Sequence, residues 1–428
     1  MQIELINTGS ELLLGRIVNT HQQWICRQLA DLGYVVNSQS CIGDEGEGIQ
    51  AAIRQALARA DMIITTGGLG PTSDDVTRDV IAQMLGREMA PDAESLARIE
   101  QYFVRLQRVM PASARAQAMI PAGARILPNG HGTAPGLAIE VNPNPFRPGG
   151  RRSWLILLPG PPRELRPMFS ESVVPLLLKE FPSAAKFVCR TLKTTGMGES
   201  LVEERIAGPL QKLVEAGLEL GYCARIGEVE VRLGARGEQG ASLVLQAEEI
   251  VRALLGGLIF GIDDATLEGT VVRVLTEQGR TVALAESCTG GLIAHRLTNV
   301  PGASAVMKGG IVAYSNEAKK ELLGVSASAL EEQGAVSEAV AREMAEGARR
   351  RCRTDYAIAV TGIAGPGGGS EAKPVGTVFM ALARETGTEV KRQFNPFDRE
   401  TFKQVTSQQA LDLLRRAVAG GTKAGRPA

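Results

Sequence analysis

The sequence predicts an α/β protein in which two doubly wound α/β domains are joined by a small α+β module. Three observations predict this class. Apolar strand patterns alternate with helical patterns over the first ~170 residues, the alternation resumes after residue ~266, and the stretch between them has a different texture. Because a chain of 428 residues is too long for one hydrophobic core, we expect three domains, over residues 1–172, 173–262 and 263–428.

The first domain is predicted from apolar strands that stop at turns and continue as helices. The expected elements are strands over 2–7, from 35 onward and over 61–65, and helices over 19–32, 49–59 and 75–85. Strands that alternate with helices in this way form a mostly parallel sheet. Residues 141–152 are rich in Pro, Gly and Asn and are expected to form an exposed loop between two strands.

The middle module and the last domain differ in their patterns. In the middle module we expect a strand over 186–196, helices over 199–213 and 243–255, and a period-2 strand pattern over 224–236. A polar, turn-rich stretch at 261–270 marks the boundary. The last domain is expected to contain helices over 266–278, 290–298, 338–351 and 399–418 and strands over 281–286, 309–313, 355–360 and 375–382. The tail, 420–428, is expected to be disordered.

Composition excludes several classes of protein. Lys plus Arg and Asp plus Glu each total 47, so the chain has no global positive charge for binding a phosphate backbone, and a nucleic-acid partner is not expected. The six cysteines form no close pair, which indicates reduced thiols rather than a disulfide framework or a zinc ribbon. Neither a signal peptide nor a membrane span is recognised, and we expect a cytoplasmic protein.

A candidate nucleophile follows the predicted strand over 281–286. Ser287 begins the run Ser-Cys-Thr-Gly-Gly, where the strand turns into a helix at the carboxyl edge of the sheet. N–H groups at such a helix start favour an anion or a developing oxyanion. A structural N-cap role for Ser287 is the alternative, and Cys288 is the rival nucleophile because a thiolate attacks better than an alcohol.

The base that such a serine needs is predicted to be a lysine. The only histidine of the last domain, His295, lies in the middle of a predicted helix, which disfavours a Ser-His-Asp triad. Lys319 follows the next strand and can reach the same sheet edge, and burial can lower the pKa of a lysine toward neutrality. Lys320 beside it is expected to be a solvated surface charge. A second Gly-rich loop, 361–370, offers N–H groups to phosphate or is simply a flexible turn.

Six ordered motifs over about 266–418 carry a family resemblance: AESCTGG, YSNEAK, GAVSE, TGIAGPGGG, KPVGTV and FDR. Together they resemble the C-terminal domain of the competence/damage-inducible CinA family, which is similar to nicotinamide mononucleotide amidohydrolases. The resemblance implies hydrolysis of the nicotinamide amide to nicotinate mononucleotide and ammonia. It implies that Ser287 is the nucleophile, Lys319 the general base and Tyr314 a supporting hydroxyl. It further implies substrate contacts by Thr361 and Arg399, and phosphate binding by the loops that contain Gly290, Gly291, Gly362 and Gly365.

The run TTGGLGPTSDD (65–75) joins a strand to a helix start, which suits an anion on helix N–H groups. Asp74 and Asp75 also stand where carboxylates stabilise a helix N-terminus, so capping is an alternative function. The run lacks the G-x-G-x-x-G fingerprint of dinucleotide-binding domains.

With TGSELLLG (8–15), GDE (43–45), GTAPG (132–136) and LPGPP (158–162), this run resembles the molybdopterin-binding fold at the front of CinA proteins. The resemblance implies an ADP-ribose pyrophosphatase with a divalent metal, most simply Mg²⁺. Asp75 is implied as a functional carboxylate and metal ligand, and Asp44 as a second ligand. The implied substrate-binding residues are Ser10, Glu11, Asn19, Gly67, Gly68 and Gly70. A carboxylate pair beside a Gly-rich phosphate cradle suits this chemistry.

The middle module resembles the KH-type domain of the same family. A KH domain that binds nucleic acid needs a G-x-x-G loop, but here Gly196-Met-Gly198 is followed by Glu199, Ser200 and two further glutamates. These acids favour a structural or dimerisation role.

From the resemblances of the first and last domains we expect a bifunctional pyridine-nucleotide hydrolase whose partners are small nucleotides, and the resemblance implies a homodimer. The alternative hypothesis is an N-terminal half that binds a pterin or nucleotide without catalysis, or that is associated with competence.

Overall fold

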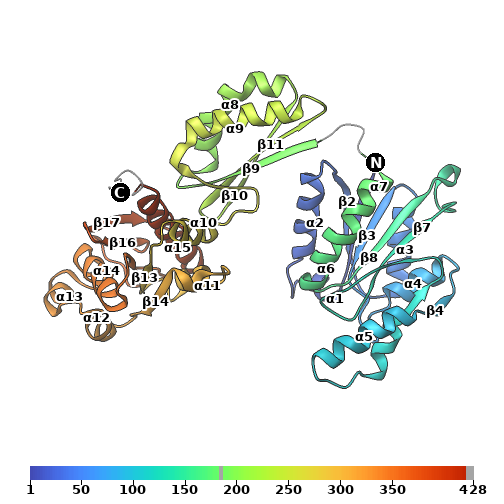
Figure 1. Ribbon diagram of the computed structural model, residues 1–428, viewed down its shortest axis with the longest axis horizontal. Helices are drawn as coiled ribbons and strands as arrows, with labels where there is room; N and C mark the ends of the chain where they lie inside the picture. Colours follow the sequence, from blue (N-terminus) through green and yellow to red (C-terminus); the bar gives the residue numbers. More distant parts are fainter. Residues whose placement is uncertain (183–186, 421–428) are drawn as a thin grey trace. The chain divides into compact units, whose positions relative to one another are not determined.

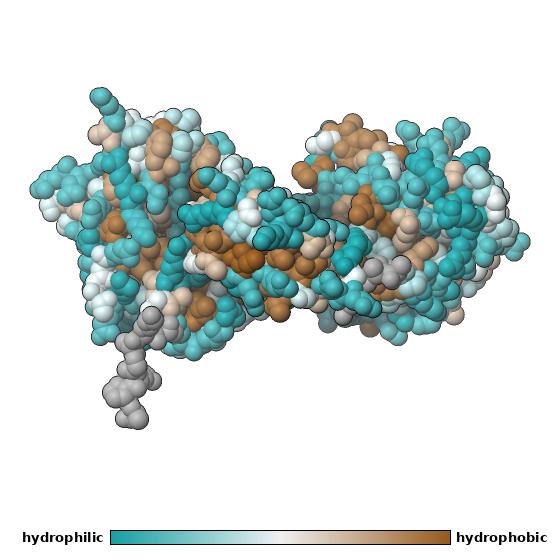
Figure 2. All heavy atoms as spheres, turned by 90° about the horizontal axis from the view of Figure 1, so that it is seen from above, coloured by the Kyte–Doolittle hydropathy of each residue, from teal (hydrophilic) through white to brown (hydrophobic). Residues whose placement is uncertain are grey.

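The computed structural model describes residues 1–182 and 187–420, which divide into two compact units, Met1–Phe187 and Val188–Ala428. Both units are α/β, as expected (Figure 1). No helix within these residues is long and apolar enough to cross a membrane. Hydrophilic residues cover most of the face seen in Figure 2, with hydrophobic patches between them. The expected tail, 420–428, lies almost entirely outside the described residues, as does Lys186 at the start of the strand expected over 186–196.

The first unit contains a six-stranded sheet in the order β2-β1-β3-β8-β7-β6, of which β2, β1, β3 and β8 are parallel. Its strands are β1 (Ile3–Thr8), β2 (Val36–Ile42), β3 (Met62–Thr66), β6 (Arg125–Leu127), β7 (Gly136–Val141) and β8 (Ser153–Leu158). A separate ribbon pairs β4 (Met89–Pro91) with β5 (Met119–Pro121). The helices are α1 (Ser10–Leu13), α2 (Thr20–Asp31), α3 (Gly46–Leu57), α4 (Thr77–Met84), α5 (Ala93–Arg105), α6 (Pro162–Met168) and α7 (Val174–Glu180).

Alternation along the strands gives this sheet two cores. On one face, Leu5, Ile64 and Trp154 pack with residues of α2, α6 and α7. On the other face, Ile63 and Leu155 pack with residues of α3 and α4. Helices on both faces leave only the strand ends open, so a site in a sheet of this kind forms at the carboxyl edge of the parallel strands.

The second unit contains two sheets. The middle module has a sheet of order β10-β11-β9-β12. It is formed by β9 (Phe187–Thr195), β10 (Leu218–Arg225), β11 (Glu228–Arg236) and β12 (Ile259–Ile262) and covered by α8 (Glu199–Glu215) and α9 (Gly240–Leu255). The pattern over 224–236 was expected as one strand, which is wrong: it contains the end of β10, a turn and β11. Period-2 alternation continues across a two-residue turn, so alternation alone did not reveal the hairpin.

The last sheet has the order β14-β13-β15-β16-β17, with the first three strands parallel. Its strands are β13 (Val282–Glu286), β14 (Met307–Val312), β15 (Tyr356–Gly362), β16 (Thr377–Arg384) and β17 (Gly387–Phe394). Its helices are α10 (Leu267–Glu277), α11 (Leu292–Thr298), α12 (Asn316–Leu323), α13 (Ala327–Gln333), α14 (Glu338–Cys352) and α15 (Arg399–Gly420). Among these, α12, α13 and β17 were not predicted, because their sequences are largely polar or short.

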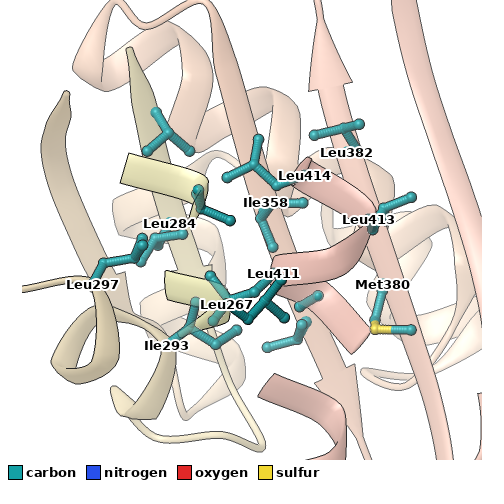
Figure 3. Packing of buried hydrophobic residues seen from close by; sticks show 14 of the residues in the cluster. Leu267, Leu284, Ile293, Leu297, Ile358, Met380, Leu382, Leu411, Leu413 and Leu414 are labelled. Atoms are coloured by element: carbon teal, nitrogen blue, oxygen red, sulfur yellow. The ribbon is translucent and has the colours of Figure 1, made fainter. Parts of the chain in front are cut away.

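Each face of this sheet packs against its own set of helices. Leu284, Ile358 and Met380 face α10, α11 and α15, and Figure 3 shows their side chains interdigitating with Leu267, Ile293 and Leu411 among others. The opposite face carries mainly alanines of β13, β15 and β16, which pack with α12, α13 and α14. Helix α11 is therefore held directly on the sheet, close to the strand end that carries Ser287.

Candidate functional sites

Three neighbouring strand ends bring the predicted residues of the last domain to one edge of its sheet. Glu286 is in register with Val312 of β14 and with Val360 of β15. The backbone N–H of Ser287 donates to the carbonyl of Val360 at 3.0 Å, and that of Ala313 donates to the carbonyl of Glu286 at 2.9 Å. Ser287, Thr361 and the segment that leads to Tyr314 therefore lie side by side at this edge, with Thr361 still paired to β16.

The loop that carries Ser287 is held from below by a buried carboxylate. Glu286 is 1% exposed, and its carboxylate oxygens accept from the N–H groups of Gly291, Ile293 and Ala294 at 2.8–3.1 Å. The N–H of Gly290 donates to the carbonyl of Ser287 at 3.2 Å. The N–H groups of Gly290 and Gly291 therefore have acceptors within the loop and are not free donors here, and a contribution of these glycines to phosphate binding stays a prediction.

Lys319 is buried at the same edge. It lies in α12, is 1% exposed, and donates from Nζ to the carbonyl oxygen of Tyr314 at 3.1 Å. In the described part of the chain no carboxylate lies within ion-pair distance of it, and burial lowers the pKa of its amine, against weaker opposing effects of Cys288 and Glu317. An amine in this environment can lose its proton and act as a base.

The described residues include no hydrogen bond between Ser287 Oγ and Lys319 Nζ, although Lys319 lies close enough to Cys288, the next residue, for each to affect the other's pKa. Catalytic hydrogen bonds are often long without substrate. Both Ser287 and Lys319 are buried, at 8% and 1% exposure.

Cys288, the rival nucleophile, lies in an unfavourable environment for a thiolate. It is 6% exposed, and burial, with a smaller effect of Glu286, raises the pKa of its thiol to about 12. The thiol therefore stays protonated at neutral pH. This argues for the serine.

The other predicted residues of this domain form a second layer. Arg399 donates to the hydroxyl of Tyr314 at 2.8 Å and to the carbonyl of Gly365 at 3.0 Å. Thr361 is 1% exposed and donates to the carbonyl of Ala335 at 2.8 Å. A Cβ on Gly362 would lie 2.9 Å from the carbonyl oxygen of Thr377, so this glycine allows close packing. The structure thus places Tyr314, Arg399 and Gly365 together, and Thr361 in contact with Ala335.

Sequence reasoning missed Lys403. It lies one turn after Arg399 in α15, and its Nζ would lie 3.9 Å from a Cβ on Gly290. Neither Arg399 nor Lys403 has an ion-pair partner among the described residues. Two cations spaced i, i+4 share a helix face, and this spacing is the signal in the sequence that could have found the second one.

The N-terminal motifs converge on a cavity of about 550 Å³ at the carboxyl edge of the first sheet. Its lining includes most of the residues that the sequence singled out, namely Glu11, Asn19, Asp44, Gly67, Gly68, Gly70, Asp74 and Asp75. Ser10 is not part of the lining. It holds the wall instead, because its backbone N–H donates to Asp44 Oδ2 at 2.8 Å and its Oγ accepts from the N–H of Asp44 at 3.3 Å.

The Gly-rich loop is shaped by left-handed glycines and by Asp75. Gly68 has φ of +67°, and a Cβ there would lie 1.9 Å from Thr77 Oγ1, so only glycine fits. Asp75 accepts from the N–H of Thr72 at 3.0 Å and from the Thr72 hydroxyl. Helix α4 begins at Thr77 without a side-chain cap. Asp74 and Asp75 thus make no side-chain cap hydrogen bond to α4, and stabilisation of its N-terminus by their charge stays the alternative. Asn19 does cap α2 by accepting from Gln22 N–H at 3.1 Å.

Two titratable residues of this cavity were not predicted, His21 and Glu164. Glu164 is 8% exposed, accepts from Asn129 Nδ2 at 2.7 Å, and has its pKa raised by burial. Burial lowers the pKa of His21. Burial thus shifts both pKa values in the direction of the neutral form, and both side chains offer hydrogen-bonding groups to the hydroxyl or amide groups of a ligand. Glu164 lies two residues after the LPGPP motif, which was the available signal.

The donor set suits a loosely held Mg²⁺ rather than an all-protein metal cage. Within residues 1–182 and 187–420, no three His, Cys, Asp or Glu side chains are grouped to hold a metal ion. Glu11 and Asp44 are nevertheless close enough to raise the pKa of Cys41 together, and both line the cavity with Asp75. Mg²⁺ commonly uses one or two carboxylates, several waters and substrate phosphates, so Asp44 and Asp75 fit such an ion.

The comparisons with known proteins cover most of the chain. Three family models match: "Probable molybdopterin binding domain" over 4–179, "Damage-inducible protein CinA KH domain" over 189–261 and "CinA C-terminal domain" over 264–418. A relative from Desulforudis audaxviator, which carries a competence-damage inducible protein name, is 46% identical over 97% of this chain and 98% of its own. A CinA-like protein from Akkermansia muciniphila is 44% identical over 96% of each. The crystal structure of a competence/damage inducible protein from Agrobacterium tumefaciens is 42% identical, with a TM-score of 0.34, over 36% of this chain and 97% of that one.

Proposed function

The chain belongs to the CinA family of competence-damage inducible proteins, and from this premise we propose that it is a bifunctional hydrolase of pyridine nucleotides. Its C-terminal domain deamidates nicotinamide mononucleotide to nicotinate mononucleotide and ammonia. Its N-terminal domain hydrolyses the pyrophosphate of ADP-ribose with a divalent metal. A homodimer stays a prediction from the resemblance.

One observation carries the deamidase proposal: Lys319 is a buried amine without a carboxylate partner in the described structure, at the strand edge that presents Ser287. A buried lysine is costly when charged. It is therefore a suitable acceptor for the proton of a neighbouring alcohol, which is a poor nucleophile until a base removes that proton.

The chemistry follows in two balanced steps. Ser287 Oγ bonds to the carboxamide carbon while its proton passes to Lys319 Nζ, and the resulting ammonium then donates that proton to the leaving nitrogen, so that the C–N bond breaks and ammonia departs. Water next attacks the acyl-serine and gives its proton to Lys319. The C–O bond to Ser287 breaks, the proton returns to Oγ, and nicotinate mononucleotide leaves.

The phosphate of the mononucleotide is proposed to bind Arg399 and Lys403. A guanidinium and an ammonium on one helix face bind a phosphate dianion well, and Tyr314 and Gly365 hold the guanidinium in place.

Replacing Lys403 with methionine is expected to raise KM for nicotinamide mononucleotide about tenfold, with kcat nearly unchanged. The reason is that a charge-assisted hydrogen bond contributes about 1.5–3 kcal/mol. Nicotinamide riboside, which lacks the phosphate, should show no such difference between the variant and the parent. An equal loss on both compounds would contradict this role.

The pH dependence follows from the direction in which burial shifts Lys319. Its lowered pKa means that the neutral amine, which is the active base, forms as pH rises through a value below that of an ordinary lysine. We expect kcat/KM to rise with pH to a plateau, with a midpoint below the usual lysine pKa, as measured by ammonia release with a coupled enzyme. Lys320→Met, at an exposed neighbour, should leave the profile unchanged. A midpoint at the usual lysine value would argue against a buried base.

The pyrophosphatase proposal depends on the cavity that unites Asp44, Asp75 and the loop Gly67–Gly70. A divalent ion bound by these carboxylates would neutralise charge on the pyrophosphate. The loop supplies a backbone cradle for the phosphates, and Glu164 and His21 supply hydrogen-bonding groups for the ribose hydroxyls.

Purified protein should be incubated with nicotinamide mononucleotide, and separately with ADP-ribose and Mg²⁺, and the products separated by chromatography. If no nicotinate mononucleotide forms, the first proposal is removed. If AMP and ribose phosphate do not form, the N-terminal half is left as a binding domain.

A further inference from the structure

A chain of hydrogen bonds joins the KH-type module to the helix that follows Ser287. Arg296 of α11 donates to Glu268 Oε2 at 2.7 Å, to Ser407 Oγ at 2.9 Å and to Gln408 Oε1 at 2.6 Å. Gln408 Nε2 donates in turn to Glu228 Oε1 at 2.7 Å. Gln408 is 3% exposed. Because Arg296 can only donate and an ionised Glu228 can only accept, the carboxamide of Gln408 has one orientation that satisfies both.

The hairpin that carries Glu228 is pressed against α15 at this point. Gly227 occupies the turn between β10 and β11 with φ of +75°, and a Cβ there would lie 3.0 Å from Gln408 Cγ. Its carbonyl accepts from the hydroxyl of Thr195, in β9, at 2.7 Å. The turn is thus fixed on both sides, and a larger residue would push Gln408 away from Arg296.

The other end of α11 is the nucleophile loop. Glu286 holds the first N–H groups of α11, and Ser287 follows Glu286 directly. Arg296 lies in the last turn of this seven-residue helix. A shift of α11 at Arg296 therefore displaces the loop at Ser287, because the helix is too short to absorb the movement.

We propose that Glu228 is a positioning residue for Ser287, acting through Gln408 and Arg296. The inference rests on the proposed deamidase function for its kinetic consequence, but the mechanical link itself does not. The KH-type module is in this view part of the catalytic framework. The glycine loop of the module supports this view, because it also lies against α15: a Cβ on Gly196 would lie 3.5 Å from Arg416.

Glu228 is partly buried among groups with opposing effects on its carboxyl group. Burial raises the pKa of Glu228, and Glu268 of α10 adds to this, whereas the hydrogen bond from Gln408 of α15 and the charges of Lys193 of β9 and Arg296 of α11 lower it. Removal of Glu228 leaves the buried amide of Gln408 without its acceptor, and an unsatisfied buried donor costs more than the hydrogen bond contributes. Gln408 is then expected to reorient and release Arg296.

The test uses the full chain with Glu228→Ala, and Glu219→Ala as a matched control in the same hairpin, where Glu219 pairs only at the surface with Arg236. We expect Glu228→Ala to lower kcat for nicotinamide mononucleotide about tenfold or more, because small displacements of reacting groups are costly, with KM within about twofold of the parent. Amide hydrogen exchange of the peptide spanning 287–298 should become faster. Glu228→Gln should restore both, since its carboxamide can still accept from Gln408.

Gln408→Met provides a second route, because it keeps the volume and removes both hydrogen bonds, and it should reproduce both effects. If the parent protein has no deamidase activity, the proposed function fails, while the exchange measurement still tests the link. Unchanged exchange over 287–298 in both Glu228→Ala and Gln408→Met would overturn the inference. Equal losses in the Glu219→Ala control would do the same, because they would reflect general damage to the module.

Discussion

Ser287→Ala and Lys319→Met are each expected to lower kcat for deamidation by at least ~10³-fold, since the members of a nucleophile–base pair act as a unit. Lys319→Met should leave the fold intact, because methionine fills a similar buried volume and removes an amine whose only described hydrogen bond goes to the carbonyl of Tyr314. Product formation and thermal unfolding should be measured on the same preparations. The double variant should be no worse than either single one.

Two controls separate this prediction from its rivals. Cys288→Ala should keep most of the activity, because the buried thiol stays protonated at neutral pH. Lys320→Met should behave like the parent. Full activity in Ser287→Ala, or loss only in Cys288→Ala, would assign the reaction to the thiol.

Asp75→Asn is expected to reduce ADP-ribose hydrolysis by at least about 100-fold, since even residues that merely orient a metal ligand cost 10–100-fold when changed. Asparagine keeps an oxygen that can accept from Thr72 N–H, so the loop should persist while the negative charge disappears. Binding of Mn²⁺, followed by its electron paramagnetic resonance in the absence of substrate, should weaken in parallel. This second measurement reports on the ion independently of turnover.

The matched control for this experiment is Asp79→Asn, an exposed carboxylate of α4 that pairs with Arg78 and does not line the cavity. It should retain activity and Mn²⁺ binding. Deamidation of the mononucleotide should be unaffected in both variants. Retained hydrolysis in Asp75→Asn would remove this carboxylate from the proposed mechanism.

The elements and the convergence of the motifs were largely predictable from the sequence. The strands before Ser287 and before the loop at Gly67 are apolar runs that end in glycine-rich turns, and parallel strands present such ends at one edge. The hairpin at Gly227 was missed because alternation crosses its turn. Helix α12 was missed because its sequence is mostly polar, although the sequence did distinguish Lys319, which is buried, from Lys320, which is exposed.

The hydrogen-bond partner of each polar group could not be predicted from the sequence. The motif gave no sign that Glu286 would take the N–H groups of Gly291, Ile293 and Ala294, since this depends on how the strand end lies under the helix. Lys403 and Gln408 likewise gain their significance from what lies opposite them in space. Local patterns predict where a chain turns, whereas pairings across the fold depend on packing that no local pattern contains.

The protonated, enclosed thiol of Cys288 has a consequence for chemical probes of this protein. Electrophiles that select reactive thiolates will pass over this centre at neutral pH and label accessible cysteines such as Cys223 instead. Reagents that capture activated alcohols, such as boronates or fluorophosphonates carrying a pyridine ring, are the better choice for reporting its occupancy.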